Sequence, residues 1–184
     1  MLPAPAGSPK TKIKGFAMCL VDDFRKAMGQ FAGAVNAITT QENGQPVGLI
    51  ATAVCSLSAE PPSVLVCVNR SASAHDVILR NGAFAVNLLH PSQCEVVEAF
   101  TRLKGTDRFA SHDWSFDTGV PMLEGAVAAI HCELKEALDG FSHSIMIGVI
   151  KEIRLRDADS EGCLLWKGKG LHCAVPMAEL ARTA

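Results

Sequence analysis

The sequence predicts a mainly β protein with short helices, a closed or split β-barrel. About seven apolar segments of strand length follow one another, and most are joined by turns. They do not alternate regularly with long helices, as a doubly wound dinucleotide-binding fold requires. At 184 residues, the chain has the length of about one domain and can bury a sizeable core.

The composition narrows the class of protein further. A hydrophobic fraction of 48%, a charged fraction of 20% and a net charge of −2 favour neither nucleic acid nor an anionic membrane as partner. The seven cysteines include no C-x-x-C pair and indicate reduced residues of a cytosolic protein. The chain shows no apolar run typical of a signal peptide or a membrane span. We therefore expect a cytoplasmic protein.

The N-terminal part is expected to be a flexible arm followed by a helix. Residues 1–21 are rich in Pro, Lys and Gly, and we expect the folded domain over 22–175 and a C-terminal tail over 176–184. Asp22 or Asp23 is suited to cap a helix at its start. The apolar face of that helix consists of Phe24, Ala27, Met28 and Phe31.

The first strands are expected around a tight hairpin. Residues 34–40 have the pattern of a strand, Asn43-Gly44 is typical of a two-residue hairpin turn, and 47–54 is the partner strand. The nearly continuous apolar run 63–68 indicates a strand that is buried on both faces.

The remaining elements alternate short helices with strands. We expect helices over 74–80 and from a Ser92 cap to residue 100, and strands over 83–88, around 130–134, 144–155 and 163–166. The stretch 101–122, which contains Gly105, Gly119 and Pro121, is the expected long functional loop.

Several common chemistries find no support. The chain has neither the glycine-rich dinucleotide motif nor the P-loop motif, and KGKG at 167–170 indicates a basic hairpin turn because no helix follows it. In the pairs His131-Cys132 and His172-Cys173, strand neighbours point to opposite faces, so no metal site is predicted. Neither a catalytic cysteine with a base nor a serine elbow is indicated.

The most informative stretch is 48–73, GLIATAVCSLSAEPPSVLVCVNRSAS. An apolar strand enters a turn rich in small hydroxyl residues, and a second apolar strand ends in Asn69-Arg70-Ser71-Ala72-Ser73. Short donors at the edge of a buried sheet, with one cation nearby, suit a flat aromatic ligand that carries a phosphate. The pattern therefore points to a flavin.

Two further motifs fit a planar ligand. Arg108 in GTDRF and His143 in GFSHSIMIG each lie beside a phenylalanine, Phe109 or Phe141, in stretches where glycines predict turns. A charged group next to an aromatic ring at a loop rim is a common way to clamp a planar ring.

On these motifs the chain resembles the short flavin reductase family, the small components of two-component flavin-dependent monooxygenases. The resemblance covers roughly residues 22–175. Its five motifs are FRKAMGQFAGAVNAITT, GLIATAVCSLSAEPPSVLVCVNRSAS, FAVNLL, GTDRF and GFSHSIMIGVI. The resemblance implies a split β-barrel that binds FMN or FAD, uses NADH or NADPH as electron donor and usually forms a homodimer with the flavin near the interface.

The resemblance also implies roles for individual residues. The isoalloxazine would be lined through main-chain groups of Ala51, Thr52, Ala53 and Val54, with Ser56 and Leu57 beside them. The ribityl and phosphate part would be held by Asn69, Ser71, Ala72, Ser73 and Arg108. His143 would orient the nicotinamide and is the one residue expected to act in catalysis, with His172 close by.

The expected function is hydride transfer from the nicotinamide to the flavin, followed by delivery of reduced flavin to a partner monooxygenase by diffusion. Ile50, where the family commonly has Thr, and Leu171, where it has an aromatic, keep open a flavin-binding sensor or carrier without turnover. A related reductase with another acceptor, such as ferric iron or a corrinoid, and a purely structural barrel also stay open. The sequence does not choose between FMN and FAD or between NADH and NADPH.

Overall fold

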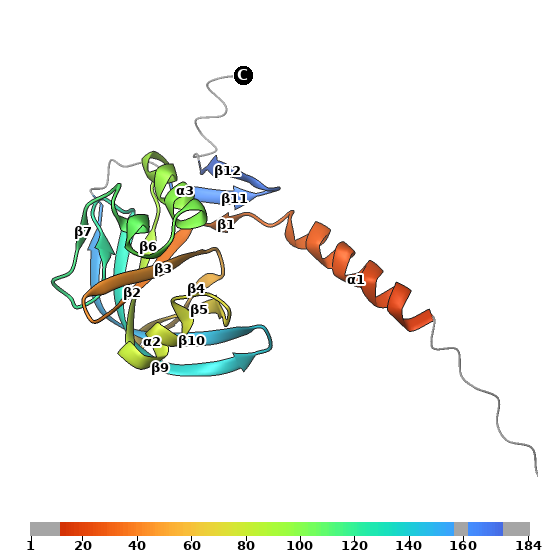
Figure 1. The fold of residues 1–184 in the computed structure, drawn as a ribbon, viewed down its shortest axis with the longest axis horizontal. Helices are drawn as coiled ribbons and strands as arrows, with labels where there is room; N and C mark the ends of the chain where they lie inside the picture. The colour runs from red at the N-terminus through yellow and green to blue at the C-terminus, as the bar shows by residue number, and fades with distance from the viewer. Residues whose placement is uncertain (1–11, 157–161, 175–184) are drawn as a thin grey trace, which may run out of the picture.

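The computed structural model describes the backbone of residues 12–156 and 162–174, and side chains from residue 19 onward. One antiparallel sheet of seven strands, in the order β3-β2-β6-β9-β10-β5-β4, forms the body of the protein (Figure 1). Its strands are β2 (Asn36–Glu42), β3 (Gln45–Ala51), β4 (Val54–Ala59), β5 (Pro62–Asn69), β6 (Ala83–Leu88), β9 (Ala128–Gly140) and β10 (His143–Leu155).

The sheet is a barrel that stays split. Its two edge strands, β3 and β4, are joined by only two residues, Thr52 and Ala53. The Cys67 N–H donates to the Ala53 carbonyl at 3.0 Å, which holds this linker against β5. The first and last strands of the sheet are therefore brought together at one end, and the split between β3 and β5 is the place where a ligand can enter.

A smaller sheet and two helices cover the open parts of the barrel. The small sheet has the order β1 (Gly33–Ala34), β11 (Leu164–Lys167), β12 (Gly170–Cys173). The helices are α2 (His75–Asn81) and α3 (Cys94–Arg102). Two further short strands, β7 (Trp114–Ser115) and β8 (Met122–Leu123), pair with each other in a separate two-stranded sheet. Helix α1 (Lys12–Met28) extends away from the barrel (Figure 1).

Apolar side chains on alternate strand positions form the barrel interior. Val66, Val68, Phe84 and Met146 are each at most 1% exposed and share one core cluster. Gly148 allows this packing, because a Cβ at that position would lie 2.6 Å from the Phe84 ring. Burial also raises the pKa of the Cys132 thiol to about 12. All seven cysteines are free, which fits the reduced state inferred from the sequence.

Most predicted elements are found, with ends shifted by one to three residues. The strand expected around 130–134 is longer, since β9 runs from Ala128 to Gly140, and the first helix ends at Met28, so Phe31 lies beyond it. Asn43 and Gly44 form the hairpin turn with φ angles of 52° and 76°, the left-handed conformation that this turn requires. Gly82 closes α2 with a φ of 68°. The predicted KGKG turn joins β11 to β12, and the second of these strands was not predicted.

Helix α1 is longer than predicted. It begins at Lys12, whereas we expected a loose arm up to residue 21, so Asp22 and Asp23 are interior residues and not caps. Their carboxylates pair one turn onward with Arg25 and Lys26 at 3.4 and 3.5 Å, as charges three residues apart on a helix do. The predictions for 1–11 and 176–184 lie outside the described residues. Among the described residues, no helix is both long and apolar enough to cross a membrane.

The prediction of a hydroxyl-rich turn after residue 54 is wrong. Residues 54–59 form edge strand β4, and the partner of the Asn43-Gly44 hairpin already ends at Ala51. Ser56 and Ser58 are exposed, because after Val54 the edge strand leaves the core and accommodates polar residues. The expected cap at Ser92 is also wrong, since α3 begins at Cys94 with Gln93 in the cap position, and Ser92 lies in the short 3-10 helix Pro91–Gln93, whose cap is His90.

Candidate active site

A pocket of about 600 Å³ lies at the split of the barrel, and we call it the barrel pocket. One side is formed by β3 and the linker, with Leu49, Ile50, Ala51, Thr52 and Ala53. The other side is formed by β5 and the β9–β10 turn, with Cys67, Asn69, Gly140, Phe141, His143 and Ile145. These walls are mainly apolar and lie at the ends of neighbouring strands, an arrangement that suits a flat ring.

The linker that forms the first wall is positioned by a close contact. Thr52 lies against Gly33 so closely that a Cβ on Gly33 would be 2.8 Å from the Thr52 Cβ. The Val54 N–H donates to the Thr52 carbonyl at 3.1 Å and turns the chain into β4. Thr52 and Ala53 are both exposed and line the pocket, while their carbonyls accept the Val54 and Cys67 N–H groups.

A second pocket of about 570 Å³ adjoins the first, and we call it the cationic pocket. Its lining residues are Gly48, Leu49, Ile50, Ser71, Ala72, Ser73, Phe100, Thr101, Lys104, Gly105 and Arg108. Leu49 and Ile50 line both pockets, so the two are continuous along β3. Neither lining contains an acidic side chain, and one contains two cations, which favours an anionic group at that end.

The serine turn of the cationic pocket is shaped by Asn69. Its Oδ1 accepts the Ser71 N–H at 2.9 Å and the Ser71 hydroxyl at 2.8 Å. The Ala72 N–H donates to the Asn69 carbonyl at 3.0 Å. This local turn is the one that an Asn side chain commonly forms, and it holds the small residues Ser71–Ser73 at the pocket surface.

Arg108 is fixed by main-chain carbonyls. Its Nη1 donates to the Gly48 carbonyl and its Nε to the Leu103 carbonyl, both at 3.0 Å. The side chain is half-buried, and it lines the pocket together with Lys104. A guanidinium held in this way places a positive charge at one location, which suits a phosphate better than a mobile surface cation does.

Ile50 lies where three cavities meet. Besides the two pockets, it lines an apolar recess of about 320 Å³ with Val35, Thr52, Val97, Thr101 and Trp166. The side chain is half-buried and packs against a core cluster. It therefore supplies an apolar surface to all three cavities and no side-chain hydrogen bond to a ligand.

His143 begins strand β10 on the second wall of the barrel pocket. It pairs with Asn69 of β5 on one side and with Gly140 of β9 on the other. Its Nδ1 lies 2.9 Å from the Ser142 hydroxyl. The ring is half-buried, so it is accessible to a ligand and oriented by a neighbour.

The structure brings most of the predicted site residues together. Ala51, Thr52, Ala53, Asn69 and His143 line the barrel pocket, and Ser71, Ala72, Ser73 and Arg108 line the cationic pocket. The residues predicted for the ring thus line the barrel pocket, and those predicted for the phosphate line the cationic pocket except Asn69, which lines the barrel pocket; their roles toward a ligand stay predictions.

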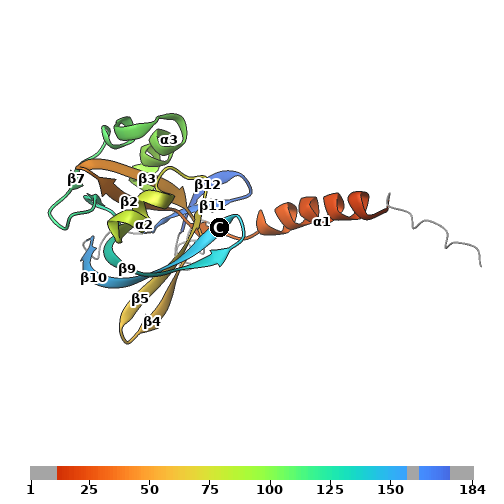
Figure 2. The same cartoon turned by 60° about the horizontal axis from the view of Figure 1, so that its bottom comes forward.

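Four predicted residues lie elsewhere. Val54, Ser56 and Leu57 are on β4 and line none of the three cavities described above. The β4–β5 hairpin extends away from the body of the barrel (Figure 2). His172 is on β12, where its Nε2 lies 3.1 Å from the Lys167 carbonyl, and β12 is well separated from the β9–β10 turn in Figure 1. The roles of these four residues stay predictions.

Sequence reasoning missed Leu49, Cys67, Gly140 and Ile145 in the barrel pocket and Phe100, Thr101 and Lys104 in the cationic pocket. Lys104 precedes the GTDRF motif and was within reach of a charge-based argument. The others carry no signal of their own, because the pairing of β5 with β10 and the packing of α3 place them.

The fold and the site together define a split-barrel protein with an apolar pocket beside a pocket that carries two cations. The chain belongs to the family described as the flavin reductase like domain, whose model matches residues 28–173. The predicted family and fold class are therefore confirmed.

Named relatives agree with this family. A protein named FMN reductase (NADH) RutF from Stutzerimonas stutzeri is 38% identical over 153 residues, which cover 82% of this chain and 87% of that protein. The 4-hydroxyphenylacetate 3-monooxygenase reductase component of Pseudomonas aeruginosa is 35% identical over 136 residues, with 72% and 80% covered. The crystal structure of a nitrilotriacetate monooxygenase component B homolog from Mycobacterium thermoresistibile aligns with a TM-score of 0.81 at 30% identity, covering 87% of this chain and 89% of that one.

Proposed function

We propose that this protein is an NADH-dependent flavin reductase that reduces FMN or FAD and releases reduced flavin to a partner monooxygenase. The observation that carries the proposal is the continuity of the barrel pocket with the cationic pocket along Leu49 and Ile50. The apolar walls of the barrel pocket suit a planar ring, and this pocket leads directly to the two cations and the serine turn of the cationic pocket. The names of its relatives, which include NADH-dependent FMN reductases and a monooxygenase reductase component, support the same reaction.

The residues fit a flavin, and each has a physical role. The Thr52–Ala53 linker forms the wall against which the isoalloxazine lies, and Ser71–Ser73 with Arg108 hold the phosphate. His143 orients the nicotinamide from the opposite wall. Hydride transfer is the chemistry that the two bound rings supply, and the protein supplies alignment and a partly dry cleft. No carboxylate is needed for that step, and neither pocket lining contains one.

The test is steady-state oxidation of NADH, followed by absorbance, with added FMN or FAD and with NADPH as the alternative donor. We expect NADH consumption that depends on added flavin. A protein that binds flavin and consumes neither nicotinamide would instead be a flavin carrier or sensor. An acceptor screen with ferric iron and a corrinoid separates the related reductases.

The role of His143 is tested with a separate variant. His143→Ala should raise the Michaelis constant for NADH or lower turnover, while flavin affinity measured without NADH stays within about twofold of wild type. If neither kinetic parameter changes, His143 does not orient the nicotinamide.

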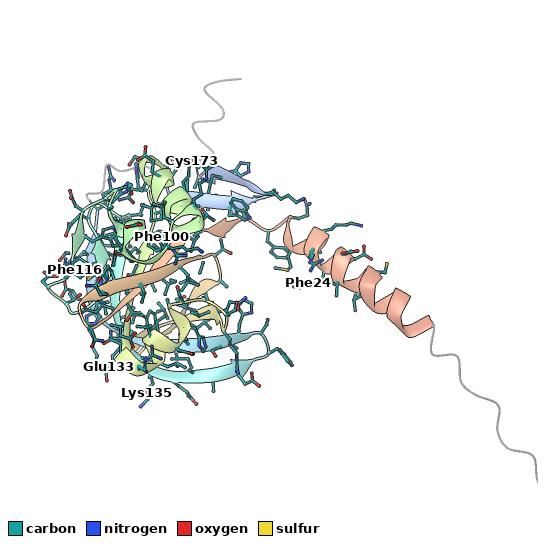
Figure 3. All side chains as sticks on the ribbon, in the orientation of Figure 1. Phe24, Phe100, Phe116, Glu133, Lys135 and Cys173 are labelled. Carbon is teal, nitrogen blue, oxygen red and sulfur yellow. The ribbon has the colours of Figure 1, made fainter. Side chains whose placement is uncertain are left out.

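We further propose a cytoplasmic homodimer. Helix α1 carries Leu20, Phe24 and Met28 with exposed fractions of 64%, 61% and 47%, and it extends away from the barrel (Figure 3). An apolar helix face of this kind is typical of a surface that associates with another protein surface. Analytical ultracentrifugation should give twice the monomer mass, and Phe24→Ser should shift the protein toward monomer.

A further inference from the structure

The turn between β9 and β10 presents an aromatic ring in an unusual way. Phe141 is 95% exposed, although large apolar side chains are normally covered in a folded protein. Its φ angle of 63° lies in the left-handed region, where a bulky residue is strained. Strain that persists in a bulky residue next to a pocket is often connected with function. Phe141 lines the barrel pocket, on the same turn as His143.

A set of hydrogen bonds holds the turn in this conformation. The Asp139 Oδ1 accepts the Phe141 N–H at 3.1 Å and also the Arg70 Nη2 at 2.7 Å. The Arg70 main-chain N–H donates to the Ser142 carbonyl at 3.0 Å, and its Nε donates to the His143 carbonyl at 3.4 Å. The turn that carries Phe141 is therefore tied to the residue that follows Asn69.

These contacts change the role of Arg70. The sequence indicated a cation available to a phosphate, but Arg70 lines neither pocket and its guanidinium is directed to Asp139. It connects the serine turn, which begins at Asn69, with the aromatic turn at Phe141. Gly140 assists, because a side chain there would approach the His143 carbonyl to 3.1 Å.

We propose that Phe141 stacks on a planar nitrogen heterocycle bound in the barrel pocket, the isoalloxazine or the nicotinamide, and that Arg70 and Asp139 act as positioning residues for it. This inference rests on the proposed function. Phe141 and the Thr52–Ala53 linker line the same pocket, so a planar ligand bound there lies within reach of the exposed ring. Offset stacking of two rings adds affinity beyond the burial of apolar area.

The test compares Phe141→Leu with Phe141→Tyr, which keeps the aromatic ring. Phe116→Leu is the matched control, because Phe116 is 43% exposed, lines neither pocket and lies on the opposite side of the barrel from the β9–β10 turn (Figure 3). Flavin affinity is measured by quenching of flavin fluorescence without NADH, and the Michaelis constant for NADH is measured separately. For loss of stacking we expect a change of about twofold to about tenfold in Phe141→Leu, and no comparable change in Phe141→Tyr or Phe116→Leu.

The two measurements show which ligand ring Phe141 contacts. A weaker flavin affinity indicates contact with the isoalloxazine, and a raised Michaelis constant for NADH alone indicates contact with the nicotinamide. If neither value changes relative to Phe116→Leu, the inference is wrong. It is also wrong if Phe141→Leu lowers the sedimenting mass while ligand affinity is kept, since Phe141 would then contact another protein chain.

The positioning role is tested with Arg70→Ala and Asp139→Ala. Each should change the same constant as Phe141→Leu, either the flavin dissociation constant or the Michaelis constant for NADH, without a larger loss of turnover. Arg70→Lys should restore part of the wild-type value of that constant. Unchanged constants in both alanine variants would overturn the positioning role. The proposed function fails separately, when the wild-type protein consumes no NADH with added flavin, and the fluorescence titration still tests Phe141 in that case.

Discussion

Arg108 offers the most direct test of how the cationic pocket recognises a flavin. The substitution Arg108→Ala removes a half-buried guanidinium whose Nη1 and Nε are fixed on the carbonyls of Gly48 and Leu103. A hydrogen bond to a charged group contributes about 1.5–3 kcal/mol. Because solvent screens part of this contribution at a half-buried site, we expect the lower end, which corresponds to about a tenfold weaker affinity for FMN.

The assay compares two ligands that differ only in the phosphate. FMN and riboflavin are titrated by fluorescence quenching against wild type and Arg108→Ala, and the ratio of their dissociation constants is taken for each protein. If Arg108 binds the phosphate, the preference for FMN falls by about tenfold in the variant, and riboflavin affinity changes little. The wild-type preference should also weaken at high salt, since ions screen charge interactions.

A neighbouring arginine serves as the control. Arg102 is at the end of α3, its side chain is 77% exposed in an ion pair with Glu98, and it lines neither pocket. Arg102→Ala should therefore leave both affinities unchanged. If Arg108→Ala weakens the affinities for FMN and for riboflavin equally, the guanidinium acts by holding the Gly48 and Leu103 carbonyls. A direct interaction of its charge with the phosphate is then refuted.

Three further predictions concern Ile50 between the pockets, Gly148 in the barrel interior and the buried thiol of Cys132. Ile50→Thr adds a hydroxyl where the three cavities meet, and we expect flavin to bind about twofold to tenfold more tightly in fluorescence titrations; equal or weaker binding would contradict this. Gly148→Ala places a methyl 2.6 Å from the Phe84 ring and should lower the free energy of unfolding by about 1–3 kcal/mol and the melting temperature by about 2–12 °C. Gly170→Ala, where the nearest atom would be 3.7 Å away, is the control and should change the melting temperature little. Because burial raises the pKa of the Cys132 thiol to about 12, that thiol should stay unlabelled by a thiol reagent at pH 8 until the protein is unfolded, and rapid labelling in the native state would show that it is accessible.

Local patterns predicted the elements well where a single residue dictates the backbone. The Asn43-Gly44 turn and the end of α2 at Gly82 followed from residues that adopt positive φ at low cost. The strand over 83–88 was predicted with its observed ends, because it is an apolar run bounded by turn residues. The serine-rich stretch after residue 54 was misread, since exposed serines are typical of a turn and also of an edge strand.

The candidate site was predicted in part for the same reason. Residues within one short motif, such as Ser71–Ser73, could be assigned to one end of a ligand because they are neighbours in the chain. Phe100 and Thr101 could not, because the packing of α3 against β3 brings them to the pocket. The sequence indicated Arg70 only as a cation near the ligand, and it could not show the pairing with Asp139, which is 69 residues away in the sequence.

The sequence by itself determined the mainly β fold class and the flavin reductase family, and it predicted motifs that line the two pockets. Strand periodicity, turn residues and motif order are local properties, and they can be read without knowing which strands pair. The tertiary structure alone decided that the barrel splits at Thr52–Ala53, that Ile50 lines three cavities, and that Arg70 holds the Phe141 turn. These features depend on strand register and on contacts between residues that are distant in the chain, and side-chain type does not encode them position by position.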